Sequence, residues 1–182
     1  MRKFMIFTAA ALLGFMFVSC TTGDDDEEEL SGNLLLNPGF EKPITTEWLN
    51  WNNFVRVNNN THSGTYSGQV GPGAGGGGQM VIGDWEGKTF EISCWVKVNA
   101  DQVLSFQVQY KTLEGSNLNF VGATPDQDPP GYFDPIDFTD GEYVYRTITL
   151  TAPANCQNIL VAFWKNSTEG YAYIDDFRLI QK

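Results

Sequence analysis

The sequence predicts an all-β protein of the sandwich class, and three observations support this. Residues Thr89–Val98 alternate between apolar and polar side chains, and Gln102–Tyr110 repeats the alternation. A period of two residues is typical of a strand with one face in a core and the other in water. Turn-forming residues separate these short runs, and no stretch after Cys20 has a convincing helical pattern. Short strands punctuated in this way favour two packed sheets.

The expected strands can be taken in chain order. Thr89–Val98 puts its apolar residues on one face and Trp95 on the polar face, and the polar face of Gln102–Tyr110 carries Gln107 and Gln109. Three later segments are rich in β-branched and aromatic residues, as strands are, namely Tyr143–Thr151, Asn158–Trp164 and Tyr171–Ile180. The glycine-rich run Gly71–Gly78 is predicted to be a flexible loop, because its GxGxxG match has no helix to receive a phosphate.

The N-terminal segment is predicted to be a secretory signal and not part of the fold. Arg2 and Lys3 precede an apolar run, Phe4–Val18, which is shorter than the ~20 residues of a membrane-spanning helix. The run ends at Ser19-Cys20, which resembles a lipoprotein box whose cysteine is lipidated. We therefore expect residues 1–19 to be a signal peptide, residues 20–32 to be the lipidated Cys20 with a linker, and residues 33–182 to form one domain.

The linker and the domain are both acidic. Asp24–Glu29 holds six acidic residues in a row, a block that repels itself and favours disorder. From Leu30 onwards the chain has 16 acidic and 9 basic residues. This balance argues against nucleic acid as a partner, because its binding needs a basic face. It also disfavours anionic polysaccharides, unless calcium bridges them to the domain.

Two short segments bracket the predicted domain and carry a family resemblance. They are Asn-Leu-Leu-Leu-Asn-Pro-Gly-Phe-Glu at 33–41 and Tyr-Ala-Tyr-Ile-Asp-Asp-Phe-Arg-Leu-Ile at 171–180. They resemble the start and finish of carbohydrate-binding modules of families four, nine and twenty-two. The resemblance implies a jelly-roll β-sandwich, galactose-binding-domain-like, in which the first and last strands pair. It also implies a non-catalytic glycan binder.

The acidic run after Cys20 resembles the surface-export signal of Bacteroidota lipoproteins. It implies a lipid-anchored protein at the outer membrane or cell surface, whose only contact with the membrane is the anchor. Other surface lipoproteins are expected partners. The plainer alternative is that the run is only a solvated spacer.

Trp95, Gln107 and Gln109 are the first candidates for a carbohydrate site. A sugar ring has apolar C–H faces and a polar rim, so it suits an aromatic platform flanked by side-chain amides. If their two strands are neighbours, the three side chains share one patch; the alternative is that Trp95 packs under a loop. Trp164 and Tyr132 are the next candidates, whereas Trp51 is interpreted as a core residue.

Glu41 and Asp175 are the candidate metal ligands. The resemblance implies a structural calcium where the opening Phe-Glu meets the aspartate of the final strand, with His62-Ser63-Gly64 resembling the loop that donates carbonyl oxygens. A half-buried carboxylate also needs a partner, and calcium prefers oxygen ligands. The alternative is a hydrogen-bonded aspartate at a strand end.

Catalytic chemistry finds little support in the sequence. The lone His62 lies beside a serine too near in sequence to suggest a triad, and no nucleophile elbow follows a strand. The sequence leaves open whether Cys94 and Cys156 form a disulfide or remain separate thiols. The sequence predicts a non-enzymatic lipoprotein that binds a neutral polysaccharide or oligosaccharide. The alternatives are an adhesion or assembly lipoprotein on the same sandwich and, less favoured, a glycoside hydrolase.

Overall fold

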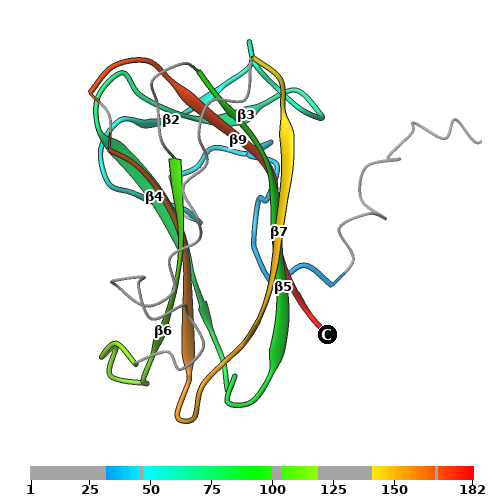
Figure 1. Ribbon diagram of the computed structural model, residues 1–182, viewed down its shortest axis with the longest axis vertical. Helices are drawn as coiled ribbons and strands as arrows, with labels where there is room; N and C mark the ends of the chain where they lie inside the picture. The colour runs from blue at the N-terminus through cyan, green and yellow to red at the C-terminus, as the bar shows by residue number, and fades with distance from the viewer. Residues whose placement is uncertain (1–31, 46, 100–103, 119–140, 167) are drawn as a thin grey trace, which may run out of the picture.

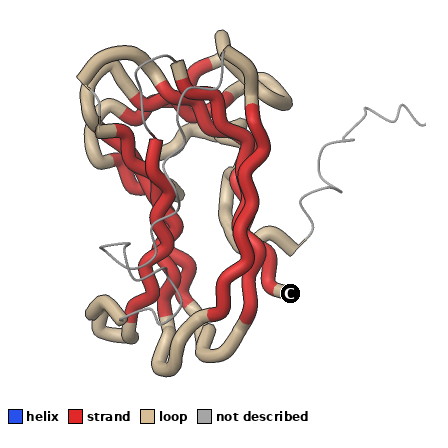
Figure 2. The backbone as a smooth tube through the Cα atoms, in the orientation of Figure 1, coloured by secondary structure: helices blue, strands red, loops and turns tan. Residues whose placement is uncertain are grey.

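The computed structural model describes residues 32–45, 47–99, 104–118, 141–166 and 168–182. These residues form strands and loops but no helix (Figure 2). Nine strands are formed within the described ranges, namely β1 (Leu49–Asn50), β2 (Phe54–Val57), β3 (Ser67–Val70), β4 (Gly75–Ile82), β5 (Thr89–Val98), β6 (Leu104–Lys111), β7 (Val144–Thr151), β8 (Asn158–Lys165) and β9 (Ala172–Gln181).

The strands make two antiparallel sheets that face each other (Figure 1). One sheet has four strands in the order β1-β4-β8-β6, and the other has five in the order β2-β3-β9-β5-β7. The opening segment joins the five-stranded sheet, because Asn33 forms a bridge with Ile180 and the Leu34 amide donates to the Leu179 carbonyl at 2.9 Å. The all-β sandwich and the pairing of the first and last segments are confirmed.

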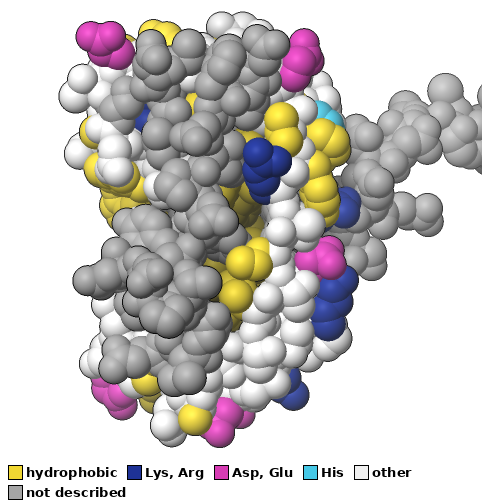
Figure 3. All heavy atoms as spheres, viewed as in Figure 1, with side chains coloured by type: hydrophobic (Ala, Val, Ile, Leu, Met, Phe, Trp, Pro, Cys, Tyr) yellow, Lys and Arg dark blue, Asp and Glu magenta, His cyan; other side chains and the backbone are white. Residues whose placement is uncertain are grey.

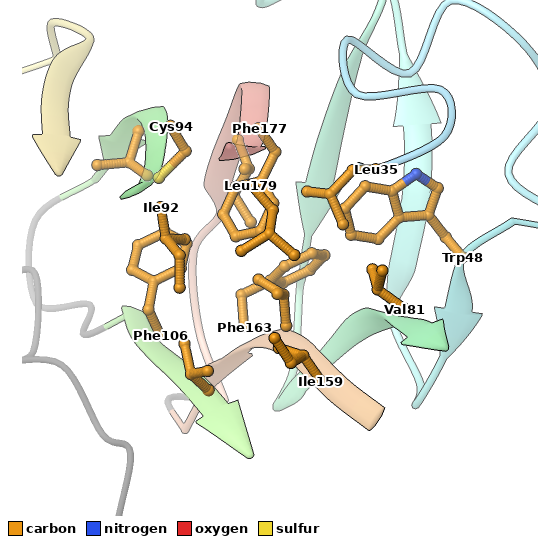
Figure 4. Close-up of a cluster of buried hydrophobic side chains, with 14 of the residues drawn as sticks. Leu35, Trp48, Val81, Ile92, Cys94, Phe106, Ile159, Phe163, Phe177 and Leu179 are labelled. Carbon is orange, nitrogen blue, oxygen red and sulfur yellow. The ribbon is translucent and has the colours of Figure 1, made fainter. Parts of the chain in front are cut away.

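The core fills the space between the two sheets. Large side chains from both sheets and from the opening segment point toward one another, with Phe163 and Phe177 near the centre (Figure 4). In the space-filling view, hydrophobic side chains show between the sheets, and acidic side chains lie at the two ends of the molecule and partway along the right-hand edge (Figure 3). The predicted apolar face of β5 supplies Phe90, Ile92 and Val96 to this core.

The glycine-rich run is a strand for half of its length, so its prediction as a flexible loop is wrong. Gly75–Gly78 begin β4, which lies between β1 and β8. A Cβ at Gly75 would lie 2.1 Å from the Asn52 carbonyl oxygen, and one at Gly76 would lie 2.0 Å from the Phe163 carbonyl oxygen. The glycines let this strand approach its neighbours more closely than any side chain permits.

The two cysteines of the domain remain separate thiols. Cys94 and Cys156 are both buried and free, which settles the open question of a disulfide. Burial raises the pKa of the Cys94 thiol well above its usual value. Within the described residues no helix is long and apolar enough to cross a membrane. Cys20 and the acidic run lie outside those residues.

Candidate functional site

The predicted patch of Trp95, Gln107 and Gln109 does not exist as one surface. β5 pairs with β7 and β9, whereas β6 pairs with β8 in the other sheet. The premise that the two strands are neighbours is therefore wrong, because the chain changes sheets between Val98 and Leu104. Trp95 faces outward on the five-stranded sheet, and the two glutamines face outward on the four-stranded sheet.

Trp95 packs under a loop. The loop 58–66 lies over the outer face of the five-stranded sheet, where the Tyr143 hydroxyl donates to the Asn60 carbonyl at 2.9 Å. The His62 ring stacks on the indole of Trp95, with ring centroids 3.9 Å apart and 14° between the planes. Tyr145 lies beside the same indole, at a centroid distance of 5.3 Å. The Trp95 face covered by His62 is therefore not available for a sugar ring.

The outer face of the four-stranded sheet brings three of the predicted residues together. Val108, Val161 and Phe163 point into the core, so the residues between them along each strand point outward. Cross-strand pairing places these outward residues in three rows: Met80–Leu160–Gln109, Gly78–Ala162–Gln107 and Gly76–Trp164–Ser105. Gln107, Gln109 and Trp164 therefore share one face.

Trp51 belongs to the same face, and its interpretation as a core residue is wrong. Its amide donates to the Gly76 carbonyl at 2.9 Å, which continues the pairing of β1 with β4. Its ring reaches across Gly78, where an added Cβ would lie 3.0 Å from Cη2 of the indole. Trp48 is the core residue instead, 4% exposed. The spacing of Trp48 and Trp51 could have revealed this, because two residues three apart in an extended segment face opposite sides.

We call this surface the platform, and its residues are Trp51, Gly76, Gly78, Met80, Ser105, Gln107, Gln109, Leu160, Ala162 and Trp164. Trp51 and Trp164 are both partly exposed, and the residues beside them in the rows are small. The amide of Gln109 donates from Nε2 to Oε1 of Gln107 at 3.1 Å, which orients the pair. The platform therefore offers two aromatic surfaces and a fixed pair of amides. Tyr132 lies outside the described residues.

Glu41, Asp175 and Asp176 come together on the other sheet. Asp175 is fully buried, and its Oδ2 accepts hydrogen bonds from the amides of His62 at 2.9 Å and Ser63 at 3.2 Å. Oε1 of Glu41 accepts from the amides of Thr65 and Tyr66, at 2.9 and 3.0 Å. A Cβ at Gly39 would meet Oδ1 of Asp176 at 3.6 Å, Oδ1 of Asp175 at 3.7 Å and Cγ of Glu41 at 3.9 Å.

The family resemblance predicts a hard cation beside this carboxylate cluster. Burial, followed by the neighbouring charge of Asp176, raises the pKa of Asp175 to about 7, despite the backbone amides that donate hydrogen bonds to its carboxylate. The described residues form no group of three or more His, Cys, Asp or Glu side chains arranged to hold a metal. A cation would therefore need backbone oxygens as well, and calcium accepts these readily. Calcium at Glu41 and Asp175 stays a prediction.

Comparison with known proteins places this geometry in context. The family model described as "Carbohydrate binding domain" matches residues 32–168. A family 16 carbohydrate-binding module superposes with a TM-score of 0.62 and 21% identity, over 81% of this chain and 99% of that one. A family 61 module, TmCBM61 in complex with β-1,4-galactotriose, superposes with a TM-score of 0.60 and 16% identity. The match covers 82% of this chain and 99% of that one.

One similar structure is part of an enzyme. The enzymatically active domain of tailspike protein 4 from bacteriophage CBA120 superposes with a TM-score of 0.66 and 13% identity. The match covers 83% of this chain but spans only 22% of the phage chain. No curated protein sequence matches this chain. At such identities the structural likeness shows the fold alone, a jelly-roll sandwich.

Proposed function

The chain belongs to the family of carbohydrate-binding domains, and from this premise we propose that the platform binds a neutral oligosaccharide or polysaccharide without cleaving it. The observation that carries the proposal is the meeting of Trp51, Trp164 and the hydrogen-bonded pair Gln107–Gln109 on one sheet face. Indole rings stack on the C–H faces of sugars, and amides both donate to and accept from hydroxyl groups.

The charge of the platform supports a neutral ligand. Its three rows carry glycine, alanine, serine, methionine, leucine, tryptophan and glutamine, and no charged side chain. The domain as a whole has more acidic than basic residues, so it repels chains with many negative charges. The ligand in the TmCBM61 complex, β-1,4-galactotriose, is itself a neutral sugar.

Substitution of the platform tryptophans tests the proposal. Trp51→Ala and Trp164→Ala should each weaken binding about tenfold or more, since truncation of a hot-spot aromatic costs about 2 kcal/mol or more and ~1.4 kcal/mol corresponds to tenfold. Gln107→Ala should weaken it less, because a net hydrogen bond contributes ~0.5–1.5 kcal/mol. Affinity electrophoresis in gels containing a panel of neutral polysaccharides measures the change.

The opposite sheet provides the control for this experiment. Tyr145→Ala removes a ring that is 42% exposed, and binding should stay as in the wild type. Trp95→Ala should lower the melting temperature, because it removes the stack with His62, and should leave the affinity unchanged. Loss of binding in Trp95→Ala with the platform variants unaffected would contradict the proposal.

A lipid anchor would display this domain at the outer membrane or cell surface. The apolar run before Cys20 and the acidic linker after it support the anchor. Cys20→Ala should move the protein from the membrane fraction to the soluble fraction, as immunoblotting of the two fractions would show. Retention of Cys20→Ala in the membrane fraction would refute lipidation at this residue.

Adhesion to other surface proteins is the second candidate function. Three apolar side chains are exposed on the four-stranded sheet, namely Leu49 at 45%, Met80 at 37% and Ile82 at 77%. An exposed apolar patch favours a protein partner. If no glycan in a broad panel binds, this candidate replaces the first.

A further inference from the structure

The five-stranded sheet ends in a long strand, β7, which lies beside β5 (Figure 1). Within the described strands β7 pairs with β5 alone, so its other edge is open. Two other edge strands are short, since β1 has two residues and β2 has four. The chain after β6 turns back onto the end of that strand, where the Leu118 amide donates to the Tyr110 carbonyl at 2.9 Å. β7 therefore leaves the edge of an eight-residue strand open.

Two hydrogen bonds show which backbone groups face this open edge. The Ala152 amide donates to the Lys88 carbonyl at 2.9 Å, so these two residues form a hydrogen-bonded pair. The Lys182 amide donates to the Thr89 carbonyl at 2.9 Å, so Thr89 turns its backbone toward β9 and not toward β7. Bonded and non-bonded pairs alternate along an antiparallel ladder, so every second residue of β7 directs its N–H and C=O away from β5. These residues are Tyr145, Thr147, Thr149 and Thr151.

The sequence of β7 has few of the features that protect the edge of a sheet. Proline, lysine or a bulge commonly interrupts such an edge and prevents pairing with another chain. Val144–Thr151 holds no proline and no lysine, and its register with β5 runs without a shift. Arg146 is its one charged residue, and the guanidinium donates to the Tyr145 carbonyl at 3.4 Å. The edge is therefore a template for a further strand.

Both faces of β7 suit a partner strand of the same kind. Ile148 and Leu150 pack against the core, but each is only partly buried. On the outer face, Thr147 and Thr149 are exposed. β7 already makes one threonine contact with β5, because Oγ1 of Thr151 lies 3.0 Å from Oγ1 of Thr89. A matching strand would bury more of the apolar pair and add threonine contacts of this type.

From this edge we infer that β7 pairs with β7 of a second copy of the chain, antiparallel about a two-fold axis at Ile148. Thr147 of one copy then lies opposite Thr149 of the other, and Ile148 meets its own equivalent. The residues whose backbone groups face the edge are paired with one another, as hydrogen bonding between antiparallel strands requires. Arg146 lies opposite Leu150, so the two guanidinium groups do not meet.

Side chains and charge select a second copy as the partner. Any extended peptide can use the open N–H and C=O groups, but this register sets threonine against threonine on the outer face and isoleucine against isoleucine at the axis. From Leu30 onwards the chain has 16 acidic and 9 basic residues, so two copies repel each other over most of their surfaces. At β7 they meet along a strand without acidic side chains.

Pairing through β7 leaves the platform open. The two-fold axis between paired antiparallel strands is perpendicular to their sheet, so both four-stranded sheets lie on the same side of the joined sheet. The platform is on the outer face of the four-stranded sheet. A dimer therefore presents two platforms in one direction. Formation of the dimer does not depend on what the platform binds.

Sedimentation velocity of the purified protein tests the inference. The molar mass of the wild type should double as the concentration rises toward about 1 mM, because a single pair of edge strands gives a weak dimer. Thr147→Pro removes an amide that faces the open edge and that the ladder with β5 does not use, so the fold should persist and the dimer should be lost. Thr147→Val is the matched control, since it keeps the amide and should still dimerise.

Paired charges test the register independently of proline. Thr147→Lys with Thr149→Lys places like charges across both threonine pairs, whereas Thr147→Lys with Thr149→Glu places opposite charges there. The second double variant should associate about tenfold more tightly than the first. Circular dichroism checks that each variant keeps its β spectrum. A wild type that stays monomeric throughout overturns the inference, and so does equal association of the two double variants, even where Thr147→Pro fails to fold.

Discussion

Phe163→Ala is expected to destabilise the domain by about 3–5 kcal/mol, the usual cost of truncating a fully buried aromatic side chain. Phe163 is 0% exposed and contacts three other rings, with centroid distances of 4.9 Å to Phe54, 6.0 Å to Trp48 and 6.3 Å to Phe177. Phe163 lies on β8 of the four-stranded sheet, whereas Phe54 and Phe177 come from the five-stranded sheet and Trp48 from the segment before β1, so the cavity would open between the two layers. Urea denaturation followed by tryptophan fluorescence measures the loss.

Two further variants show whether the stability lost in Phe163→Ala comes from the core cavity. Phe163→Leu keeps most of the volume and should cost clearly less than Phe163→Ala. Ile82→Ala, at a side chain that is 77% exposed, should change stability by less than about 0.5 kcal/mol. Equal costs for Phe163→Ala and Ile82→Ala would contradict the central place of Phe163 in the core.

Without a divalent cation, the stability of the domain is expected to fall as the pH rises from about 4 to about 7. The pKa of Asp175 is raised from 3.8 to about 7 in the folded protein, so the folded state holds a proton that the unfolded state has released. The contribution of Asp175 to stability is complete below its pKa in the unfolded state. It is lost as the pH rises through its pKa in the folded state. Its size is on the order of 4 kcal/mol, at about 1.4 kcal/mol per unit of pKa.

Calcium should reverse this dependence. The ion binds the ionised carboxylate, so the stabilisation by calcium should grow with pH, and at pH 8 a chelator should lower the melting temperature of the wild type. Asp175→Asn should lose both effects. Thermal melts of each protein at pH 5 and pH 8, with chelator and with calcium, give the four melting temperatures to compare. Identical wild-type melts with chelator and calcium at pH 8 would contradict the calcium site, and a flat profile in chelator would contradict the raised pKa.

The sequence was sufficient to predict the strands but not to predict which strands pair with one another. Period-two alternation assigned the inward and outward residues of β5 and β6 correctly, because the side-chain period belongs to each strand alone. Which strands lie side by side depends on the path of the chain between the sheets. The alternation of apolar and polar residues within a strand gives no information about that path. Consecutive strands are usually neighbours, but here β5 and β6 belong to different layers.

The candidate site was therefore found in part. Gln107, Gln109 and Trp164 share the platform, while Trp95 lies on the opposite side of the molecule under His62. Trp51 was missed because β1 is only two residues long, so the spacing between Trp48 and Trp51 was the one sign in the sequence that they face opposite sides. The glycines of β4 were misread because glycine favours loops in general, and only the close backbone contacts of this strand reveal why glycine is needed there.

The separation of the platform from the opening segment has a mechanical consequence. The chain enters the fold on the five-stranded sheet through Asn33 and Leu34, and the platform lies on the outside of the other sheet. Under the proposed anchoring, tension between a membrane and an immobile polysaccharide pulls the two layers apart, loading the aromatic core between them. Polar contacts also cross between the layers: the side-chain amide of Gln79 on β4 exchanges two hydrogen bonds with the backbone of Leu36. Resistance to such a pull comes mainly from ring packing and not from the ladders of either sheet.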